Sequence, residues 1–387
     1  MTLTIGIGNF RWRTMIKLIE NFRAKIVLLF FALLILLFSG VVTAQSFKIT
    51  TITKGLEHPW GMAFLPNGDM LVTERSGRLR LIQDGKLEQK AIAGLPSIQA
   101  NGQGGLLDVI LHPDYLKNGW IYFSYAEPGE KGMGTAVSRA RLKDLQLLDV
   151  EKIFSMNIKN GGGRHFGSRL LFDEKGYLYI TIGDRGEQDR AQLLNDHAGS
   201  VIRLHDDGRL PKDNPFVKQP GVKAEIYSYG HRNPQGMSLH PQTGEVWIHE
   251  HGPQGGDELN RIQPGKNYGW PVITFGVNYF FGTKIGEGTH KEGMEQPLYY
   301  WVPSIAPSGM AFYTGDKFPE WKNNLFIGSL KFQLLVRLEL QGGKVVKEER
   351  LLEGKLGRIR DVRTGPDGFL YLLTDKNNGA VVRLEPL

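Results

Sequence analysis

Apolar residues recur along the chain in one repeated arrangement, two short strands joined by a polar turn. In HPWGMAFLPNGDMLVTER, at residues 58–75, an apolar run is followed by the turn PNG and then by a second apolar run. The same order returns at residues 106–127, 168–186, 234–252, 308–330 and 360–387. Turns such as PNG, EKG and PDG contain the residues that accept the backbone angles of a β-hairpin. The pattern therefore predicts six β-hairpins.

Six similar hairpins in one chain predict an all-β fold, a six-bladed β-propeller whose blades are four-stranded antiparallel sheets. One or two β-sandwiches are the alternative, but a sandwich does not need the same strand–turn–strand unit six times. An isolated early strand, FKITTIT, occupies residues 47–53. We expect it to pair with the C-terminal blade and close the ring, because closure hides sheet edges that otherwise promote aggregation.

The first 44 residues have a different pattern from the rest. Five Lys and Arg residues precede the apolar stretch IVLLFFALLILLFSGVV, which ends at VTA before Gln45. This order is typical of a secretory signal peptide, here with cleavage after Ala44. An uncleaved membrane anchor is the alternative, since the stretch is long enough to span a bilayer. We expect a leader at 1–44 and a single catalytic propeller at 45–387, located in the periplasm or secreted.

Composition narrows the possible partners. The chain has no cysteine, which excludes a disulfide framework and a lipoprotein linkage. Its net charge of +7 falls to +3 without the leader, because the leader carries five Lys or Arg residues and one Glu. So small a charge argues against nucleic acid or a membrane surface as the partner.

Several polar side chains lie in glycine-rich loops that lead directly into strands. NGQGGLLDV contains Gln103, NGGGRHFGSRLLF contains His165, and YSYGHRNPQG contains Arg232 and Asn233. Glycine lets the backbone approach a ligand, and the following strand provides rigidity. The simpler interpretation is that a lone loop histidine is solvated and that Asn before Pro only starts a turn.

Two arginines in GRIRDVR, Arg358 and Arg360, alternate along a predicted strand and share one face. Like charges side by side are unfavourable unless an anion lies between them. The pair therefore indicates an anionic ligand at the mouth of the channel.

Four motifs in order resemble one known family. GQGGLL, the His before SRLLFDEKGYLYITIGDRG, YGHRNPQG and HGPQGGDELNRIQPGKNYGWP resemble the soluble, pyrroloquinoline quinone (PQQ)-dependent aldose sugar dehydrogenases of the glucose/sorbosone dehydrogenase group. The resemblance runs from about Gly55 to the C-terminus. It implies a six-bladed propeller with PQQ at the channel mouth, resting on calcium. The implied reaction oxidises the C1 hydroxyl of an aldose to the lactone, with hydride transfer to PQQ.

The resemblance also implies roles for individual residues. His165 matches the general base, and Arg232 matches the residue that stabilises negative charge developing on the cofactor. Cofactor contacts are implied for Gln103, Arg232, Asn233, Tyr279, Lys331, Arg358 and Arg360. Calcium ligands are implied for the carbonyls of Gly252 and Pro253, and for Glu258 and Tyr268 at a further, structural calcium. Cationic side chains suit the three carboxylates of PQQ, and calcium prefers oxygen ligands.

Short loops between the blades predict an open mouth and broad sugar specificity. The electron acceptor is unidentified, and we expect a monomer or a homodimer. A calcium-dependent lactone hydrolase is one alternative, but its site needs several converging acidic side chains, and Asp257 and Glu258 are adjacent in one loop. A non-catalytic binding propeller is another, but it has no need for His165 together with Arg232 and Lys331.

Overall fold

The structure, a computed structural model, describes residues 46–387, so the expected leader at 1–44 lies outside the described residues. The described part contains six four-stranded sheets. Its only helices are the short α2 (Tyr115–Asn118) and the 3₁₀ turns η1 (Gln188–Gln192) and η2 (Pro319–Trp321). Within residues 46–387, the structure contains no helix with the length and apolar character needed to span a bilayer.

Each sheet is antiparallel, and five of the six are formed by four strands consecutive in the chain. The first two sheets contain β2 (Pro59–Phe64), β3 (Met70–Glu74), β4 (Arg78–Gln83) and β5 (Lys86–Leu87), then β6 (Leu106–Leu111), β7 (Trp120–Gly129), β8 (Gly132–Lys143) and β9 (Gln146–Ser155). The next two contain β10 (Leu170–Phe172), β11 (Leu178–Thr181), β12 (Ser200–Leu204) and β13 (Ile226–Tyr229), then β14 (Pro234–Leu239), β15 (Val246–Glu250), β16 (Asp257–Arg261) and β17 (Tyr299–Trp301). The last two contain β18 (Pro307–Phe312), β19 (Leu325–Ser329), β20 (Leu335–Gln341) and β21 (Lys344–Leu351), then β22 (Ile359–Thr364), β23 (Leu370–Thr374), β24 (Gly379–Pro386) and β1 (Phe47–Leu56).

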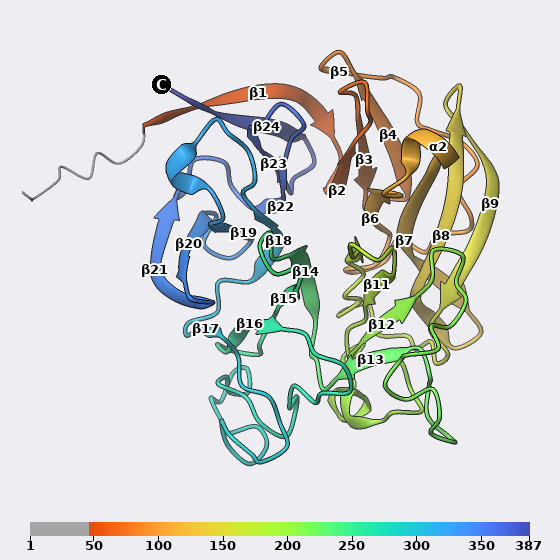
Figure 1. Cartoon of the computed structure of the whole chain (residues 1–387), viewed down its shortest axis with the longest axis vertical. Coiled ribbons are helices and arrows are strands. Elements are labelled where there is room, and N and C mark those ends of the chain that lie inside the picture. Colours follow the sequence, from red (N-terminus) through yellow and green to blue (C-terminus); the bar gives the residue numbers. More distant parts are fainter. Residues whose placement is uncertain (1–45) are drawn as a thin grey trace, which may run out of the picture. The chain divides into compact units, whose positions relative to one another are not determined.

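The six sheets form a closed ring around a common centre (Figure 1). The first strand of each sheet contacts the first strand of the next, in the order β2, β6, β10, β14, β18, β22 and back to β2. Each predicted hairpin supplies the two inner strands of one sheet, for example β2 and β3 from residues 58–75. The predicted six-bladed β-propeller with four-stranded antiparallel blades is therefore confirmed.

The ring closes through the earliest strand. β1 pairs with β24 in antiparallel register, from Phe47 opposite Pro386 to Leu56 opposite Gly379. The expected pairing of FKITTIT with the C-terminal blade is confirmed, and the sixth sheet contains strands from both ends of the described chain.

Apolar side chains fill the spaces between neighbouring sheets. Leu71 and Leu79 of the first sheet pack with Val109 and Phe123 of the second. Similar clusters of buried residues lie between each of the other neighbouring pairs. Both faces of most inner strands are covered, so these strands are buried along their whole length. The same packing holds the blades, and thus the loops of the site that they carry, in fixed positions.

Buried ion pairs join the inner strands β6 and β22 to Arg169, the residue before β10, at the centre of the ring. Asp108 on β6 accepts from Arg169 (3.1 Å) and Arg363 (2.8 Å), and both arginines also contact Asp361 on β22 at 3.0 Å. The guanidinium of Arg169 also lies over the ring of Trp60, 4.2 Å from its centroid. Because each charge has a partner, the network offsets the cost of burying charge in the channel.

Candidate active site

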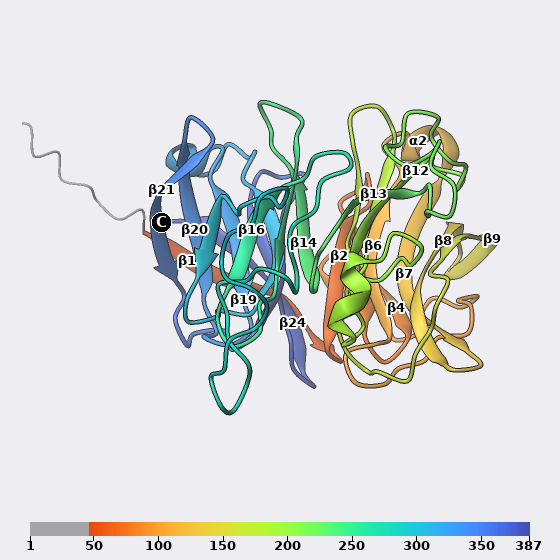
Figure 2. The same cartoon turned by 90° about the horizontal axis from the view of Figure 1, so that it is seen from below.

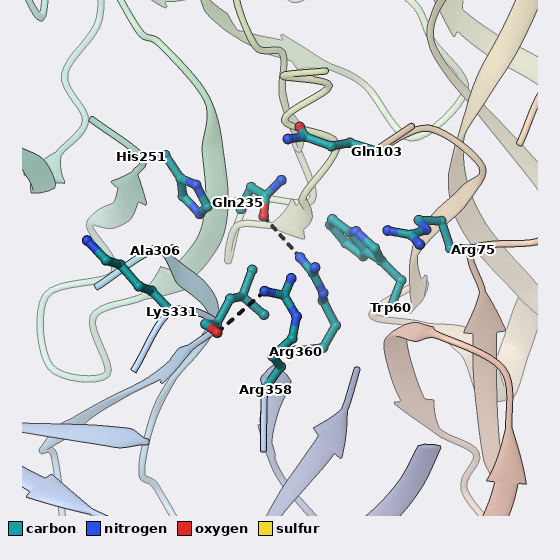
Figure 3. Close-up of a pocket in the computed structure, with 10 residues that line it drawn as sticks. Trp60, Arg75, Gln103, Gln235, His251, Ala306, Lys331, Arg358 and Arg360 are labelled. Atoms are coloured by element: carbon teal, nitrogen blue, oxygen red, sulfur yellow. Dashed lines mark hydrogen bonds between the residues drawn. The ribbon is translucent and has the colours of Figure 1, made fainter. Parts of the chain in front are cut away.

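A cavity of about 340 Å³ lies where loops from several blades converge. Its lining contains four positively charged side chains and no acidic one. The residues that line it are Trp60, Arg75, Gln103, Gln235, His251, Ala306, Leu330, Lys331, Arg358 and Arg360 (Figure 3). Gln103, Lys331, Arg358 and Arg360, all predicted cofactor contacts, are thus brought together although more than 250 residues separate the first from the last.

Asp375 lies between the two arginines that were expected to require an anionic ligand. Its Oδ2 accepts hydrogen bonds from Arg360 Nη2 (2.8 Å) and Arg358 Nη2 (3.2 Å), and its Oδ1 contacts His58 Nδ1 at 2.7 Å. The repulsion between the arginines is therefore partly relieved within the chain, and the inference of a ligand from that pair alone was wrong. The case for an anionic ligand rests instead on the charge of the whole cavity.

The glycine loop before β10 places His165 with little freedom. The buried guanidinium of Arg185 donates to the carbonyl oxygens of Gly162 and Arg164 and lies 3.5 Å from the centroid of the Phe166 ring. The backbone N–H of His165 donates to Gln103 Oε1 at 2.8 Å, and His165 itself has φ of 54°. A positive φ is unfavourable for a residue with a side chain, so the loop is held in this conformation by its surroundings.

A buried carboxylate sets the orientation and protonation of the His165 ring. Nδ1 lies 2.6 Å from Asp184 Oδ1, which also accepts from the N–H of Gly186 at 2.7 Å; Asp184 Oδ2 accepts from Trp270 Nε1 at 2.8 Å. Burial raises the pKa of Asp184, but the hydrogen bond from His165 and nearby positive charge outweigh it and lower the pKa. Since an ionised carboxylate only accepts, Nδ1 carries the proton and Nε2 keeps its lone pair.

The pKa of His165 is also shifted. Burial of the ring lowers it below the usual value, the hydrogen bond to Asp184 acts in the opposite direction, and the positive charge of Arg232 lowers it further. The ring is therefore neutral at neutral pH, and Nε2 can accept a proton.

A second cavity, of about 170 Å³, contains His165 and Asp184 in its lining together with Arg232, Pro253 and Tyr279. Tyr279 is half exposed, and its hydroxyl donates to the Pro253 carbonyl at 3.1 Å. Arg232 Nη1 donates to the carbonyl of Gly252 at 2.7 Å. Pro253 lines this cavity, and Gly252 lines a small cavity that shares Arg232 and Trp270 with it. Each of the two predicted calcium carbonyls accepts the hydrogen bond given above, and a carbonyl oxygen has two lone pairs.

Asn233 is buried beside the His165 loop, with its Oδ1 accepting from the N–H of Gly167 at 3.1 Å. Among the described residues neither Asn233 Nδ2 nor Arg232 Nε has a hydrogen-bond partner. Buried donors without partners are uncommon, so these two atoms mark where a ligand oxygen fits.

Glu258 and Tyr268 line a very small cavity whose lining also includes Glu250. Asn260 Nδ2 lies 3.3 Å from Glu250 Oε1 and 3.2 Å from Glu258 Oε2. Burial raises the pKa of Glu258 well above its ordinary value, and the charge of Glu250 adds to the effect. Two buried carboxylates without a cation between them are unfavourable, and a cavity of about 10 Å³ has room for one ion.

The side chain of Tyr268 is directed elsewhere: its hydroxyl donates to the Arg261 carbonyl at 2.5 Å, and its ring stacks on His231. Only a main-chain oxygen of Tyr268 is therefore suited to a cation. Within residues 46–387 no group of three or more His, Cys, Asp or Glu side chains could hold a metal. The two carboxylates, carbonyls and the partnerless Asn260 Oδ1 form an all-oxygen set, which fits calcium.

Asp257, the neighbour of Glu258 on β16, points away from that cavity. Its Oδ1 accepts from the N–H of Gly252 at 2.9 Å, and its Oδ2 accepts from Ser304 Oγ at 2.6 Å and from the N–H of Ile305 at 2.7 Å. Successive strand residues face opposite sides, so the two adjacent carboxylates do not converge.

A family model described as Glucose / Sorbosone dehydrogenase matches residues 56–383, which is most of the chain. The chain belongs to the glucose/sorbosone dehydrogenase family. The predicted family, and with it the prediction that the chain is an enzyme, is confirmed.

Members of the glucose/sorbosone dehydrogenase family resemble the chain along most of its length. Aldose sugar dehydrogenase YliI of Escherichia coli is 48% identical over 345 residues, covering 88% of this chain and 93% of the relative. The apo crystal structure of the soluble aldose sugar dehydrogenase from E. coli superposes with a TM-score of 0.86, covering 88% of this chain and 100% of the other. The PQQ-bound aldose sugar dehydrogenase from Streptomyces coelicolor, 27% identical, gives a TM-score of 0.72 and covers 88% and 99%.

For this glucose/sorbosone dehydrogenase family member, several residues of the site were not found from the sequence. They are Trp60, Arg75, Asp184, Gln235, Glu250, His251, Trp270 and Asp375. Asp184 lies in ITIGDRG, three residues after the buried strand β11, and an acidic residue soon after a buried strand is a usable signal. Asp375 directly follows the buried strand β23 and carries the same signal, whereas Trp270 had none.

Proposed function

We propose that the chain is a PQQ- and calcium-dependent aldose sugar dehydrogenase that oxidises the C1 hydroxyl of aldoses to the lactone. The observation that carries the proposal is the neutral His165, which is oriented by Asp184 and whose backbone N–H donates to Gln103. Gln103 in turn lines the cavity whose only charged side chains are cations. A binding surface has no need for an oriented base, whereas a dehydrogenase must remove a hydroxyl proton.

The residues that would hold PQQ are those of the cationic cavity. Lys331, Arg358 and Arg360 suit its carboxylates, and Gln103 and the unpaired Asn233 Nδ2 suit its remaining oxygens. The carbonyls of Gly252 and Pro253 suit the calcium beneath it, and Tyr279 borders the same region. When bound, PQQ supplies the two-electron acceptor for the C1 hydrogen of the sugar, with calcium as Lewis acid.

The chain itself supplies the base and the electrostatics. Asp184 holds the Nδ1 proton of His165, so Nε2 takes the proton of the anomeric hydroxyl. Arg232 is held by the Gly252 carbonyl, and its unpaired Nε is available to stabilise negative charge that develops on the acceptor oxygen. Trp270 donates to Asp184 and keeps that carboxylate in line with the imidazole.

Glu258, with Glu250 and a main-chain oxygen of Tyr268, is proposed to bind a second, structural calcium. Residues 45–387 form the catalytic propeller in this proposal, and residues 1–44 are a leader for export to the periplasm or beyond. We also propose that the enzyme accepts many aldoses, passes its electrons to an unidentified acceptor, and is a monomer or a homodimer.

A lactone hydrolase is less well supported. It needs acidic side chains that converge on one metal, and Asp257 is committed to the N–H groups of Gly252 and Ile305, away from Glu258. The oriented His165 likewise disfavours a non-catalytic binding module.

Reconstitution tests the proposal. Purified protein is incubated with PQQ and calcium, and dye reduction is followed with a panel of mono- and disaccharide aldoses. We expect activity with several aldoses and no strong preference for glucose; no activity with any aldose refutes the proposal. His165→Ala should retain PQQ binding and lose turnover. A variant that turns over at the wild-type rate shows that His165 is not the base.

A further inference from the structure

Arg75 is the one cation of the large cavity to which the family resemblance assigns no role. It directly follows β3 and lines both the 340 Å³ cavity and a neighbouring cavity of about 270 Å³. Its backbone is firmly held, because its N–H donates to the His58 carbonyl at 3.1 Å and its own carbonyl packs against Gly105 so closely that no side chain fits there. The guanidinium lies beside Trp60, across the cavity from Lys331 (Figure 3).

Two carboxylates near Arg75 already have other partners: Glu74, the preceding residue, and Glu57, which lines the 270 Å³ cavity together with Arg75. Glu74 pairs with Arg78 (2.6 Å) and Arg80 (3.3 Å), and Glu57 pairs with Arg78 at 2.6 Å. Within residues 46–387, the Arg75 guanidinium takes part in no ion pair or side-chain hydrogen bond. A partly buried arginine without an acidic partner at the wall of a cavity is best explained by an anionic ligand.

The charge of the cavity points the same way. Arg75, Lys331, Arg358 and Arg360 contribute four positive charges, and Asp375 neutralises one of them. Of these four cations, Asp375 pairs with Arg358 and Arg360 only, so Arg75 and Lys331 are the two cations of this lining that have no acidic partner among the described residues. A ligand with several carboxylates fits such a lining.

We propose that Arg75 is a further cofactor-binding residue, which pairs with a carboxylate of PQQ on the side of the cavity opposite Lys331. The inference rests on the proposed function, because it takes PQQ as the ligand. Arginine is suited to this role, since its planar fork donates two parallel hydrogen bonds to one carboxylate.

Binding of PQQ, measured without turnover, tests the inference. PQQ is titrated into the full chain at constant calcium, and quenching of tryptophan fluorescence, to which Trp60 in the cavity contributes, gives the Kd at several salt concentrations. Arg75→Gln is compared with Arg75→Lys and with Arg209→Gln. Arg209 is an exposed arginine that pairs only with Asp207, so its substitution is a matched loss of one charge outside the cavity.

Arg75→Gln should raise the Kd for PQQ by about 10- to 100-fold, the range expected for lost hydrogen bonds to a charged group. It should also weaken the dependence of the Kd on salt, because one screened charge pair is gone, an effect that altered packing alone does not produce. Arg75→Lys should restore the salt dependence and part of the affinity, and Arg209→Gln should change neither.

The outcomes separate the two proposals. If the wild type binds PQQ and Arg75→Gln binds it with the same Kd and salt dependence, the role of Arg75 is refuted and the proposed function stands. If Arg75→Gln is misfolded by circular dichroism, Arg75→Lys decides. A raised Kd with the salt dependence retained supports a bidentate charge contact, because lysine keeps the charge and loses the planar fork, and an unchanged Kd overturns it. If the wild type itself does not bind PQQ, the proposed function fails and this inference fails with it.

Discussion

Asp184→Asn gives a sharp test of how the site is built. Three N–H donors converge on the two carboxylate oxygens of Asp184, from His165 Nδ1 and Gly186 N on one oxygen and from Trp270 Nε1 on the other. An asparagine has one oxygen and one NH₂ group, so one of its two orientations must be chosen. Either choice places an NH₂ group against at least one buried N–H.

The magnitude follows from these contacts. If the asparagine oxygen faces Trp270, its NH₂ group faces both His165 Nδ1 and the Gly186 N–H. The NH₂ group then donates to Nδ1, so the ring proton moves to Nε2 and His165 can no longer act as the base. With its oxygen toward His165, the base is kept but the NH₂ faces Trp270. A buried donor without a partner costs about 1–3 kcal/mol, so the free energy of unfolding should fall by that amount. The lost charge-assisted hydrogen bond should lower kcat/KM by roughly 10- to 150-fold, and by more if the first orientation dominates.

The assays are urea unfolding and kcat/KM for an aldose, with PQQ and calcium present, as a function of pH. In the wild type the acid limb of kcat/KM should lie below pH 6.5, because burial lowers the pKa of His165. Asp184 raises that pKa, so in the variant the limb should move to still lower pH while the plateau falls. Asp114→Asn, which removes an exposed carboxylate paired only with Lys117, is the control and should change nothing. An Asp184→Asn enzyme with wild-type kcat/KM and an unshifted pH profile contradicts the assignment of Asp184 as the residue that positions His165.

Two further predictions concern stability. Deleting residues 378–387 removes β24, including the buried Val381, Val382 and Leu384. At roughly 2–5 kcal/mol for each buried side chain, this loss is comparable to the usual 5–15 kcal/mol stability of a domain, so no cooperative melting is expected. A variant that melts like the full chain refutes ring closure as the source of stability. A calcium chelator should lower the melting temperature of the wild type, because calcium bound at 100 times its Kd adds about 2.7 kcal/mol to the free energy of unfolding. Glu258→Gln should make the effect of the chelator smaller, leaving only the part due to calcium at the Gly252 and Pro253 carbonyls. An unchanged chelator effect excludes Glu258 as a ligand.

Local patterns in the sequence were sufficient for the fold. The alternation of apolar runs with PNG, EKG and PDG turns predicted six hairpins, and each supplies the inner strands of one sheet (Figure 2 shows them from the side). The pairing of β1 with β24 was also predictable. A single strand before the first hairpin has no partner nearby in the chain, and pairing with the last blade covers the exposed edges of both strands. Hairpins are formed by residues close in the chain, so their signals are local.

The partners of the site residues were decided by the tertiary structure. Nothing near Arg358 and Arg360 in the sequence shows that Asp375 lies between them, and nothing near His165 shows that Trp270 fixes its carboxylate. The amino-acid sequence specifies which residue types are available for the chemistry: a loop histidine, several arginines and glycines that allow close approach. Only the closed ring decided which of them meet, because each contact joins loops from different blades, and charge, burial and hydrogen bonding depend on those neighbours rather than on neighbours in the chain.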